Sequence, residues 1–174
     1  MKTILSEAQL AITIKRLSNQ LLENHLNLKD TVLIGIQPRG IHFSDRIVKE
    51  LSEQMPTKKI NYGKLDITFY RDDVRQGLHT LNHTDIPFSI ENKNVVLIDD
   101  VLYTGRTIRA ALDALLDFGR PAKVELCVLI DRRFSRQLPI QPDYVGKAID
   151  SIISQKVIVF WKGKDKIEEV QLVE

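Results

Sequence analysis

Residues 95–107 read Val-Val-Leu-Ile-Asp-Asp-Val-Leu-Tyr-Thr-Gly-Arg-Thr, and this stretch decides the fold. The four apolar residues from Val95 to Ile98 indicate a strand that is buried on both faces of a sheet. Two carboxylates, Asp99 and Asp100, follow this strand, and a small polar turn then leads into apolar residues at helical spacing. A strand, a turn and a helix in this order predict an α/β fold with a parallel sheet.

Two other apolar runs, 32–36 and 124–130, predict further buried strands of the same sheet. An amphipathic helix is predicted at about 7–25, and Ser6 and Gln9 at its start have the spacing of a capping box. Helical spacing of apolar residues also follows the first and second strands. The region 60–70, rich in Ile, Tyr, Phe and Thr, indicates a strand or a bent hairpin, and 157–173 indicates a closing β-hairpin.

The composition predicts a single domain spanning 1–174. Lys and Arg number 25 against 23 Asp and Glu, which gives a net charge of +2. This excludes a protein whose whole surface binds nucleic acid non-specifically, so any anion site has to come from a local arrangement. The composition also excludes disorder, a collagen-like fibre and a disulfide scaffold.

The single cysteine, Cys127, lies in the apolar run 124–130, where we expect a buried core residue rather than a catalytic thiol. No apolar stretch approaches the roughly 20 residues that span a bilayer. The first residues contain Glu7 and no apolar core of signal-peptide length. We therefore expect a cytoplasmic protein with no membrane partner.

The polar turn after Ile98 has the chemistry of a phosphate site. Ligands of open α/β sheets bind outside the carboxyl ends of the strands, and a helix N-terminus there favours a phosphate group. Gly105 lets the backbone approach a ligand closely, and the carboxylates of Asp99 and Asp100 suit a sugar diol or phosphate-bound Mg²⁺. The alternative is an ordinary turn in which Asp100 or Thr104 only caps the helix. A nucleotide triphosphatase is disfavoured because the Walker A pattern is absent.

Residues 71–86 are polar and show no periodicity. A loop of about sixteen residues is unusual inside a compact domain. We expect a functional lid or a disordered segment here.

The stretch 99–107 resembles the phosphoribosyl-pyrophosphate (PRPP) signature of type I phosphoribosyltransferases. Its form is similar to that of one branch, the bifunctional pyrimidine operon attenuator/uracil phosphoribosyltransferase proteins. Four further segments resemble this branch in order and spacing, and together they cover roughly residues 4–150: 35–41, 65–73, 113–121 and 138–147. The resemblance implies a central, mostly parallel sheet flanked by helices, with a small hood at about 131–150 and the C-terminal β-hairpin.

The resemblance also implies roles for individual residues. Asp99 and Asp100 would hold the ribose hydroxyls of PRPP, directly or through Mg²⁺, and are the implied metal residues. Arg39 and Arg71 would act on the pyrophosphate, with Arg71 at the mouth of the lid. The 5-phosphate would lie on the turn that includes Val101, Leu102, Tyr103, Thr104, Gly105, Arg106 and Thr107. The pyrophosphate loop would be Gln37, Pro38, Arg39 and Gly40, where an unusual peptide geometry is common in the family and proline makes a cis bond less costly.

The implied reaction converts uracil and PRPP to UMP and pyrophosphate with Mg²⁺. In the family the hood reads the base, which here points to Asp131 and Arg132. A second implied activity is binding of pyrimidine operon mRNA, for which the candidate contacts are Lys15, Arg16, Arg133 and Arg136; a solvated loop is the alternative for 132–136. The family also suggests a homodimer or larger homo-oligomer.

The sequence departs from the branch at several points. Gln37-Pro38 stands where a basic residue and threonine are usual, residue 24 is Asn where Arg is frequent, and Arg133-Phe134 changes the usual Gly-His. Because the catalytic positions are kept while the RNA positions drift, our hypothesis is an intact enzyme with doubtful RNA attenuation. The alternatives are an RNA-binding attenuator with little enzymatic role, or a phosphoribosyltransferase for another base.

Overall fold

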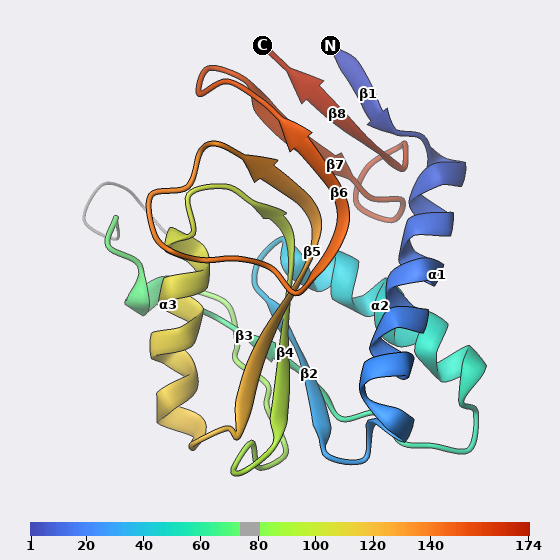
Figure 1. Cartoon of the computed structure of the whole chain (residues 1–174), viewed down its shortest axis with the longest axis vertical. Coiled ribbons are helices and arrows are strands. Elements are labelled where there is room, and N and C mark those ends of the chain that lie inside the picture. Colours follow the sequence, from blue (N-terminus) through green and yellow to red (C-terminus); the bar gives the residue numbers. More distant parts are fainter. Residues whose placement is uncertain (74–80) are drawn as a thin grey trace.

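The computed structural model describes residues 1–73 and 81–174, and five strands of this part form a central sheet that is parallel throughout (Figure 1). Their order across the sheet is β3-β2-β4-β5-β6. In chain order the strands are β2 (Thr31–Ile36), β3 (Tyr62–Leu65), β4 (Asn94–Leu102), β5 (Lys123–Arg133) and β6 (Tyr144–Asp150). The predicted α/β architecture is therefore confirmed.

Helices cover both faces of the sheet, as its apolar strands require (Figure 1). Along β4, Val96 and Ile98 pack in a core shared with α1 (Glu7–Asn24) and α2 (Gly40–Gln54). Val95 and Leu97 face the other way, into a second core with α3 (Arg106–Leu115). Successive side chains of a strand alternate between faces, so one continuous apolar run serves both cores.

A second, antiparallel sheet lies beyond the carboxyl ends of the parallel strands (Figure 1). It contains β7 (Lys156–Phe160) and β8 (Glu169–Val173), which confirms the predicted C-terminal hairpin. The N-terminal strand β1 (Lys2–Leu5) adds to β8, so that the order is β1-β8-β7. The sequence pattern does not predict β1, because a four-residue strand has no periodicity to reveal it.

The local predictions agree with the structure in most places. Helix α1 spans almost the predicted range, and its capping box is formed: Ser6 N donates to Gln9 Oε1 at 3.0 Å and Gln9 N to Ser6 Oγ at 3.4 Å. The region 60–70 is not a hairpin; it is β3 followed by a 3₁₀ turn at Thr68–Tyr70, and β3 pairs in parallel with β2. Strand β6, at the sheet edge, was missed, since Gly146 and Lys147 interrupt its apolar residues.

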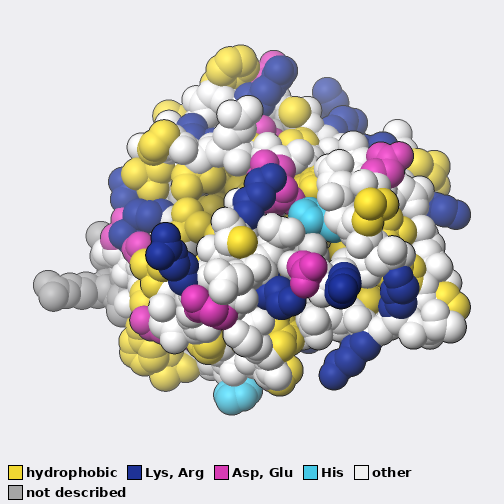
Figure 2. Space-filling model, turned by 60° about the horizontal axis from the view of Figure 1, so that its bottom comes forward, with side chains coloured by type: hydrophobic (Ala, Val, Ile, Leu, Met, Phe, Trp, Pro, Cys, Tyr) yellow, Lys and Arg dark blue, Asp and Glu magenta, His cyan; other side chains and the backbone are white. Residues whose placement is uncertain are grey.

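No helix among the described residues is long and apolar enough to span a membrane. Basic and acidic side chains are interspersed over the face shown in Figure 2, with the basic ones somewhat more numerous. This distribution agrees with a net charge of only +2. Cys127 is fully buried and its thiol is free, as expected for a core residue.

A buried polar cluster joins the amino ends of three strands to the end of α1. His25 Nε2 lies 2.6 Å from Glu125 Oε2, and the Tyr144 hydroxyl donates to the same oxygen at 2.9 Å. His25 Nδ1 lies 3.1 Å from Thr31 Oγ1. Burial alone would raise the pKa of Glu125, but hydrogen bonds from Lys123, Tyr144 and His25 outweigh it and lower that pKa. The ionised form of Glu125 therefore stabilises the fold.

We expect Glu125→Gln to lower the free energy of unfolding near pH 7 by about 1–3 kcal/mol, because it removes charged hydrogen bonds in a buried cluster. A lowered native pKa means that this stabilisation is complete above the unfolded-state pKa and is lost as pH falls through the native pKa. The stability difference between wild type and variant should thus shrink on acidification. Urea unfolding at several pH values measures it, with the exposed Glu53→Gln as control. A difference that does not change with pH contradicts this account.

Candidate active site

Asp99 and Asp100 lie within β4 near the carboxyl edge of the sheet. The turn was predicted to begin at Asp99, but β4 continues to Leu102, because its backbone keeps pairing with β5 as far as Asp131. Both aspartates are only 6% exposed, and Asp100 N donates to Asp99 Oδ1 at 3.0 Å. Burial raises the pKa of both carboxyls, and the neighbouring charge of Asp100 raises that of Asp99 further.

The turn after β4 leads directly into the N-terminus of α3. Gly105 precedes the helix with φ of 91°, a left-handed conformation that favours glycine. The N-cap residue, Gly105, makes no side-chain capping bond. Arg106 N donates to Thr104 Oγ1 at 3.4 Å, and the other N–H groups of the first turn can bind an anion. A cavity of about 270 Å³ adjoins this turn and is lined by residues 101–108 together with 71–73 and Asp99.

A second cavity, of about 600 Å³, shares Arg71, Asp99 and Tyr103 with the first. Its lining brings the four predicted catalytic residues together with the start of β7: Arg39, Arg71, Asp99, Asp100, Lys156, Val157 and Ile158. The positive charge of Arg39 partly offsets the raised pKa of Asp100, as that of Arg71 does for Asp99. Cations and buried carboxylates thus face one space.

The predicted pyrophosphate loop passes from β2 into α2. The Gln37–Pro38 peptide bond is cis, and Gln37, Pro38 and Arg39 line the second cavity. Gln37, which replaces a usual basic residue, is only 8% exposed, and its Nε2 donates to the carbonyl of His83 at 2.6 Å. This side chain holds the segment around His83 instead of presenting a charge to the cavity.

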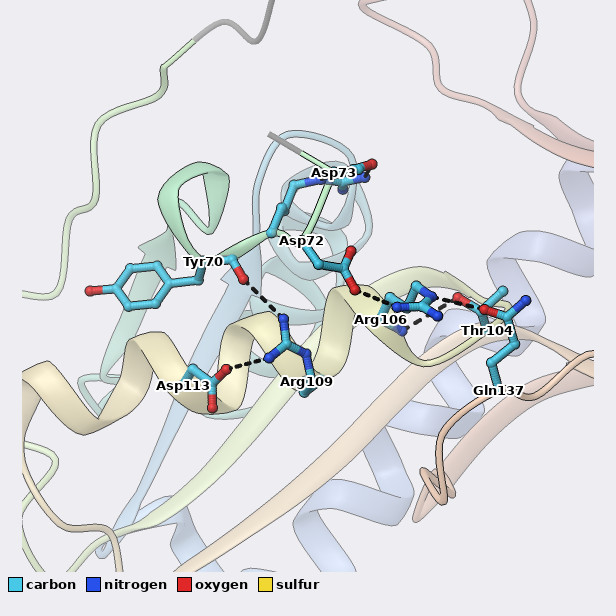
Figure 3. A network of polar contacts seen from close by, with 9 residues as sticks. Tyr70, Asp72, Asp73, Thr104, Arg106, Arg109, Asp113 and Gln137 are labelled. Atoms are coloured by element: carbon cyan, nitrogen blue, oxygen red, sulfur yellow. Dashed lines mark hydrogen bonds and ion pairs between the residues drawn. The ribbon is translucent and has the colours of Figure 1, made fainter. Parts of the chain in front are cut away.

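The first residues of the predicted lid are anchored to α3 (Figure 3). Arg109 Nη2 donates to the carbonyl of Tyr70 at 3.2 Å, and Asp72 forms an ion pair with Arg106. Arg71 is bound by Asp73 through Nε at 2.7 Å and Nη2 at 2.6 Å. Of the predicted lid 71–86, residues 74–80 lie outside the described residues.

The two residues assigned to base reading differ in their surroundings. Asp131 is paired with Arg136 at 2.5 Å and does not line either cavity. Arg132 is buried, lines the larger cavity and stacks on the Tyr103 ring at 4.0 Å. The cavity-lining residues of β7 were missed, because their approach to β4 depends on the packing of two sheets. The apolar run 157–160 indicated a strand but not its position.

Most of the residues named for RNA contact already have partners within the chain. Arg16 Nη2 donates to the carbonyl of Gly146 at 2.6 Å, and Arg133 pairs with Asp150 at 2.8 Å. Arg136 binds Asp131 and the Tyr103 carbonyl, both at 2.5 Å. Lys15 is exposed on α1. The structure therefore does not gather these four side chains into one free basic surface.

The fold and this site define a phosphoribosyltransferase: the chain belongs to the family described as the phosphoribosyl transferase domain, whose model matches residues 1–162. It is similar to the bifunctional protein PyrR of Picosynechococcus sp., with 46% identity over 171 residues that cover 98% of this chain and 96% of the relative. The bifunctional protein PyrR of Enterococcus faecalis is 44% identical over 167 residues, which cover 93% of each chain.

Solved structures agree on the fold. A hypoxanthine phosphoribosyltransferase from Staphylococcus aureus matches with a TM-score of 0.75 and 22% identity, over 100% of this chain and 93% of the other. One from Trypanosoma cruzi matches with a TM-score of 0.77 and 18% identity, over 100% and 95%. The architecture is that of the type I phosphoribosyltransferases, as the sequence resemblance implied.

We expect Gly40→Ala to disturb the site through Asp99. A Cβ at this first residue of α2 would lie 2.7 Å from the Ile98 carbonyl oxygen and 2.9 Å from Asp99 Oδ1. Since the backbone has to shift, the free energy of unfolding should fall by about 1–3 kcal/mol. Thermal unfolding measures the loss, with Gly163→Ala as the control. A Cβ at Gly163 would have no neighbour within 4 Å, so its cost of roughly 1 kcal/mol should come from the positive φ of this residue alone. Equal losses at the two positions contradict the predicted clash.

Proposed function

We propose that this protein is a uracil phosphoribosyltransferase that forms UMP and pyrophosphate from uracil and PRPP. The observation that carries the proposal is the convergence of Asp99, Asp100, Arg39 and Arg71 on one cavity beside the uncapped N-terminus of α3. Membership of the phosphoribosyltransferase family supports the reaction type. Identity of 42–46% to proteins named PyrR supports a pyrimidine substrate.

In the proposed reaction, the bond from C1 of the ribose to pyrophosphate breaks and a bond to N1 of uracil forms, while the N1 proton is lost. Positive charge grows on the ribose and negative charge on the leaving group. Arg39 and Arg71 would stabilise the pyrophosphate, and the carboxylates of Asp99 and Asp100 would hold the ribose hydroxyls. Arg71 would have to exchange Asp73 for the ligand, which is feasible because their ion pair is about a third exposed.

The N-terminal turn of α3 would hold the 5-phosphate. Backbone N–H groups there point out of the helix, and the helix dipole favours an anion. Gly105 packs so closely on Ile140 that a Cβ would lie 3.0 Å from it. The turn is thus held in one conformation before the ligand arrives, which reduces the cost of ordering it.

Asp99 and Asp100 fit Mg²⁺ that is bound together with substrate. The described residues contain no cluster of three or more His, Cys, Asp or Glu side chains that would enclose a metal. Mg²⁺ in proteins is commonly bound by one or two carboxylates plus substrate oxygens, which agrees with this donor set. The ion would offset the repulsion between the two buried carboxylates and neutralise charge on the pyrophosphate.

The base would lie towards the 131–150 segment, where Arg132 is the residue that lines the cavity. Asp131 lines neither cavity, and its Oδ1 accepts a hydrogen bond from Arg136. A panel of uracil, hypoxanthine, guanine and orotate tests the choice of base. Formation of product from a purine alone would assign another substrate to the same reaction.

A second function, binding of pyrimidine operon mRNA in the presence of UMP, is favoured by the bifunctional proteins to which the chain is similar. Gel-shift titration with an operon leader RNA, with and without UMP, tests it. Since Arg16, Arg133 and Arg136 have partners within the chain, we expect few phosphate contacts, and therefore binding that is weak and depends only slightly on salt. We further propose a homodimer or larger oligomer and a cytoplasmic location, which sedimentation and fractionation can test.

We expect Asp99→Asn with Asp100→Asn to reduce kcat/KM for PRPP by at least 10²-fold, because the variant loses electrostatic stabilisation worth several kcal/mol in the transition state. UMP formation measured by chromatography is the assay. The matched control is Asp30→Asn. The exposed Asp30 carboxylate pairs with Lys93 and lies at the amino end of β2, away from the site at the carboxyl ends of the strands. Activity that survives the double substitution would remove the carboxylates from the proposed mechanism.

Removal of divalent cations should abolish UMP formation, since two buried carboxylates and pyrophosphate repel each other without a cation. The measurement is the initial rate after treatment with EDTA and after addition of MgCl₂. Full recovery with Mg²⁺ is expected. An unchanged rate in EDTA contradicts the proposed cation requirement.

A further inference from the structure

The Arg132 side chain connects two segments that are far apart in the sequence. Its guanidinium stacks on the ring of Tyr103 at 4.0 Å, in the turn between β4 and α3. On its other side it donates to three oxygens of one short segment, residues 151–155. These contacts are Nε to Ser151 Oγ at 2.8 Å, Nη2 to the Ile152 carbonyl at 3.1 Å, and Nη2 to the Gln155 carbonyl at 2.9 Å.

Arg132 differs from the neighbouring arginines in having no carboxylate partner among the described residues. Arg133 and Arg136 each form an ion pair with a carboxylate, whereas the contacts of Arg132 within the described residues are neutral oxygens and an aromatic ring. Its residue is only 4% exposed, and burial lowers the pKa of the guanidinium. A buried charge without a counter-charge is costly, so a role for Arg132 beyond surface solvation is indicated.

The segment that Arg132 holds has few other anchors. It has no helix or strand, and the side chains of Ile152 and Ile153 are 65% and 83% exposed. Its other hydrogen bonds among the described residues are local: Gln155 N donates to the Ile152 carbonyl, and Ile152 N donates to Gln155 Oε1. With little apolar burial and only local bonds, such a segment should open easily without Arg132.

The 151–155 segment leads directly into β7, whose first residues line the larger cavity. Gln155 is followed directly by Lys156, and Lys156, Val157 and Ile158 line the larger cavity together with Asp99 and Asp100. Tyr103, at the other side of Arg132, lines both cavities. One guanidinium therefore stands between the turn at α3 and the strand that closes the cavity.

We propose that Arg132 is a positioning residue that clamps the 151–155 segment, and with it the start of β7, against the Tyr103 turn. Through this clamp, a ligand that orders the turn also orders the wall of the cavity formed by Lys156, Val157 and Ile158. This inference rests on the proposed function only for its catalytic consequence. The mechanical link itself can be measured without turnover.

Hydrogen exchange followed by mass spectrometry tests the link directly. In Arg132→Gln, amides of 151–155 should exchange at least 10-fold faster than in wild type, while those of the β1–β8 pair stay unchanged. Addition of UMP should slow exchange in 151–155 of the wild type but not of the variant. Equal exchange of 151–155 in the two proteins overturns the proposal, whatever their enzymatic activity. If Arg132→Gln does not fold, Arg132→Lys carries the same measurement, because a lysine keeps the charge but cannot match the planar fork.

Kinetics test the catalytic consequence. Arg132→Gln should lower kcat/KM for PRPP about 10²-fold, since small misplacements of site groups have effects of this size. Arg132→Lys should restore part of it. The control Arg120→Gln, at an exposed residue that lines neither cavity, should match wild type. A double-mutant cycle with Tyr103→Leu should be non-additive, because both changes break the same clamp. Additive effects, or a loss explained by a smaller folded fraction alone, contradict the positioning role. If exchange in 151–155 is faster in Arg132→Gln but the wild type itself forms no UMP, the clamp is upheld and the proposed function is refuted.

Discussion

The burial of two adjacent carboxylates at the carboxyl end of β4 is the constraint on which the site depends. Asp99 and Asp100 follow Ile98, the last residue of β4 that pairs with β2, and the pairing of β4 with β5 continues past them to Leu102, which keeps the two carboxylates next to each other. Burial raises the pKa of both, and Arg39 and Arg71 counter this only in part. Because the two arginines offset the cost of the buried carboxylates only in part, the site favours a ligand that brings a cation and hydroxyl donors, as PRPP with Mg²⁺ does.

Several parts of the fold position this pair of carboxylates. The two cores fix β4 from both faces, α2 begins at Gly40 directly against Asp99, and α3 begins at the end of the same strand. The antiparallel sheet adds a wall through β7. The polar groups of the site are thus positioned by rigid elements, which lowers the reorganisation needed when charge develops.

The sequence predicts what is encoded locally and misses what depends on packing between distant segments. The strand, turn and helix around 99–107 form one continuous unit, so their chemistry could be inferred from neighbouring residues. Arg39 and Arg71 were assigned by resemblance, because no local pattern places them beside Asp99. The addition of β1 to β8, the strand at β6 and the approach of Lys156 to the cavity arise from contacts between distant segments. The bonds of Arg132 to residues 151–155 are unpredictable for the same reason.

The most direct measurement is a crystal structure of the protein with PRPP and Mg²⁺. The account predicts the 5-phosphate on the backbone N–H groups of residues 103–107 and the ribose hydroxyls on Asp99 and Asp100. It also predicts pyrophosphate in contact with Arg39 and Arg71, the latter released from Asp73. A ligand bound elsewhere, or a ribose that does not contact either aspartate, would contradict the central role of the buried carboxylate pair.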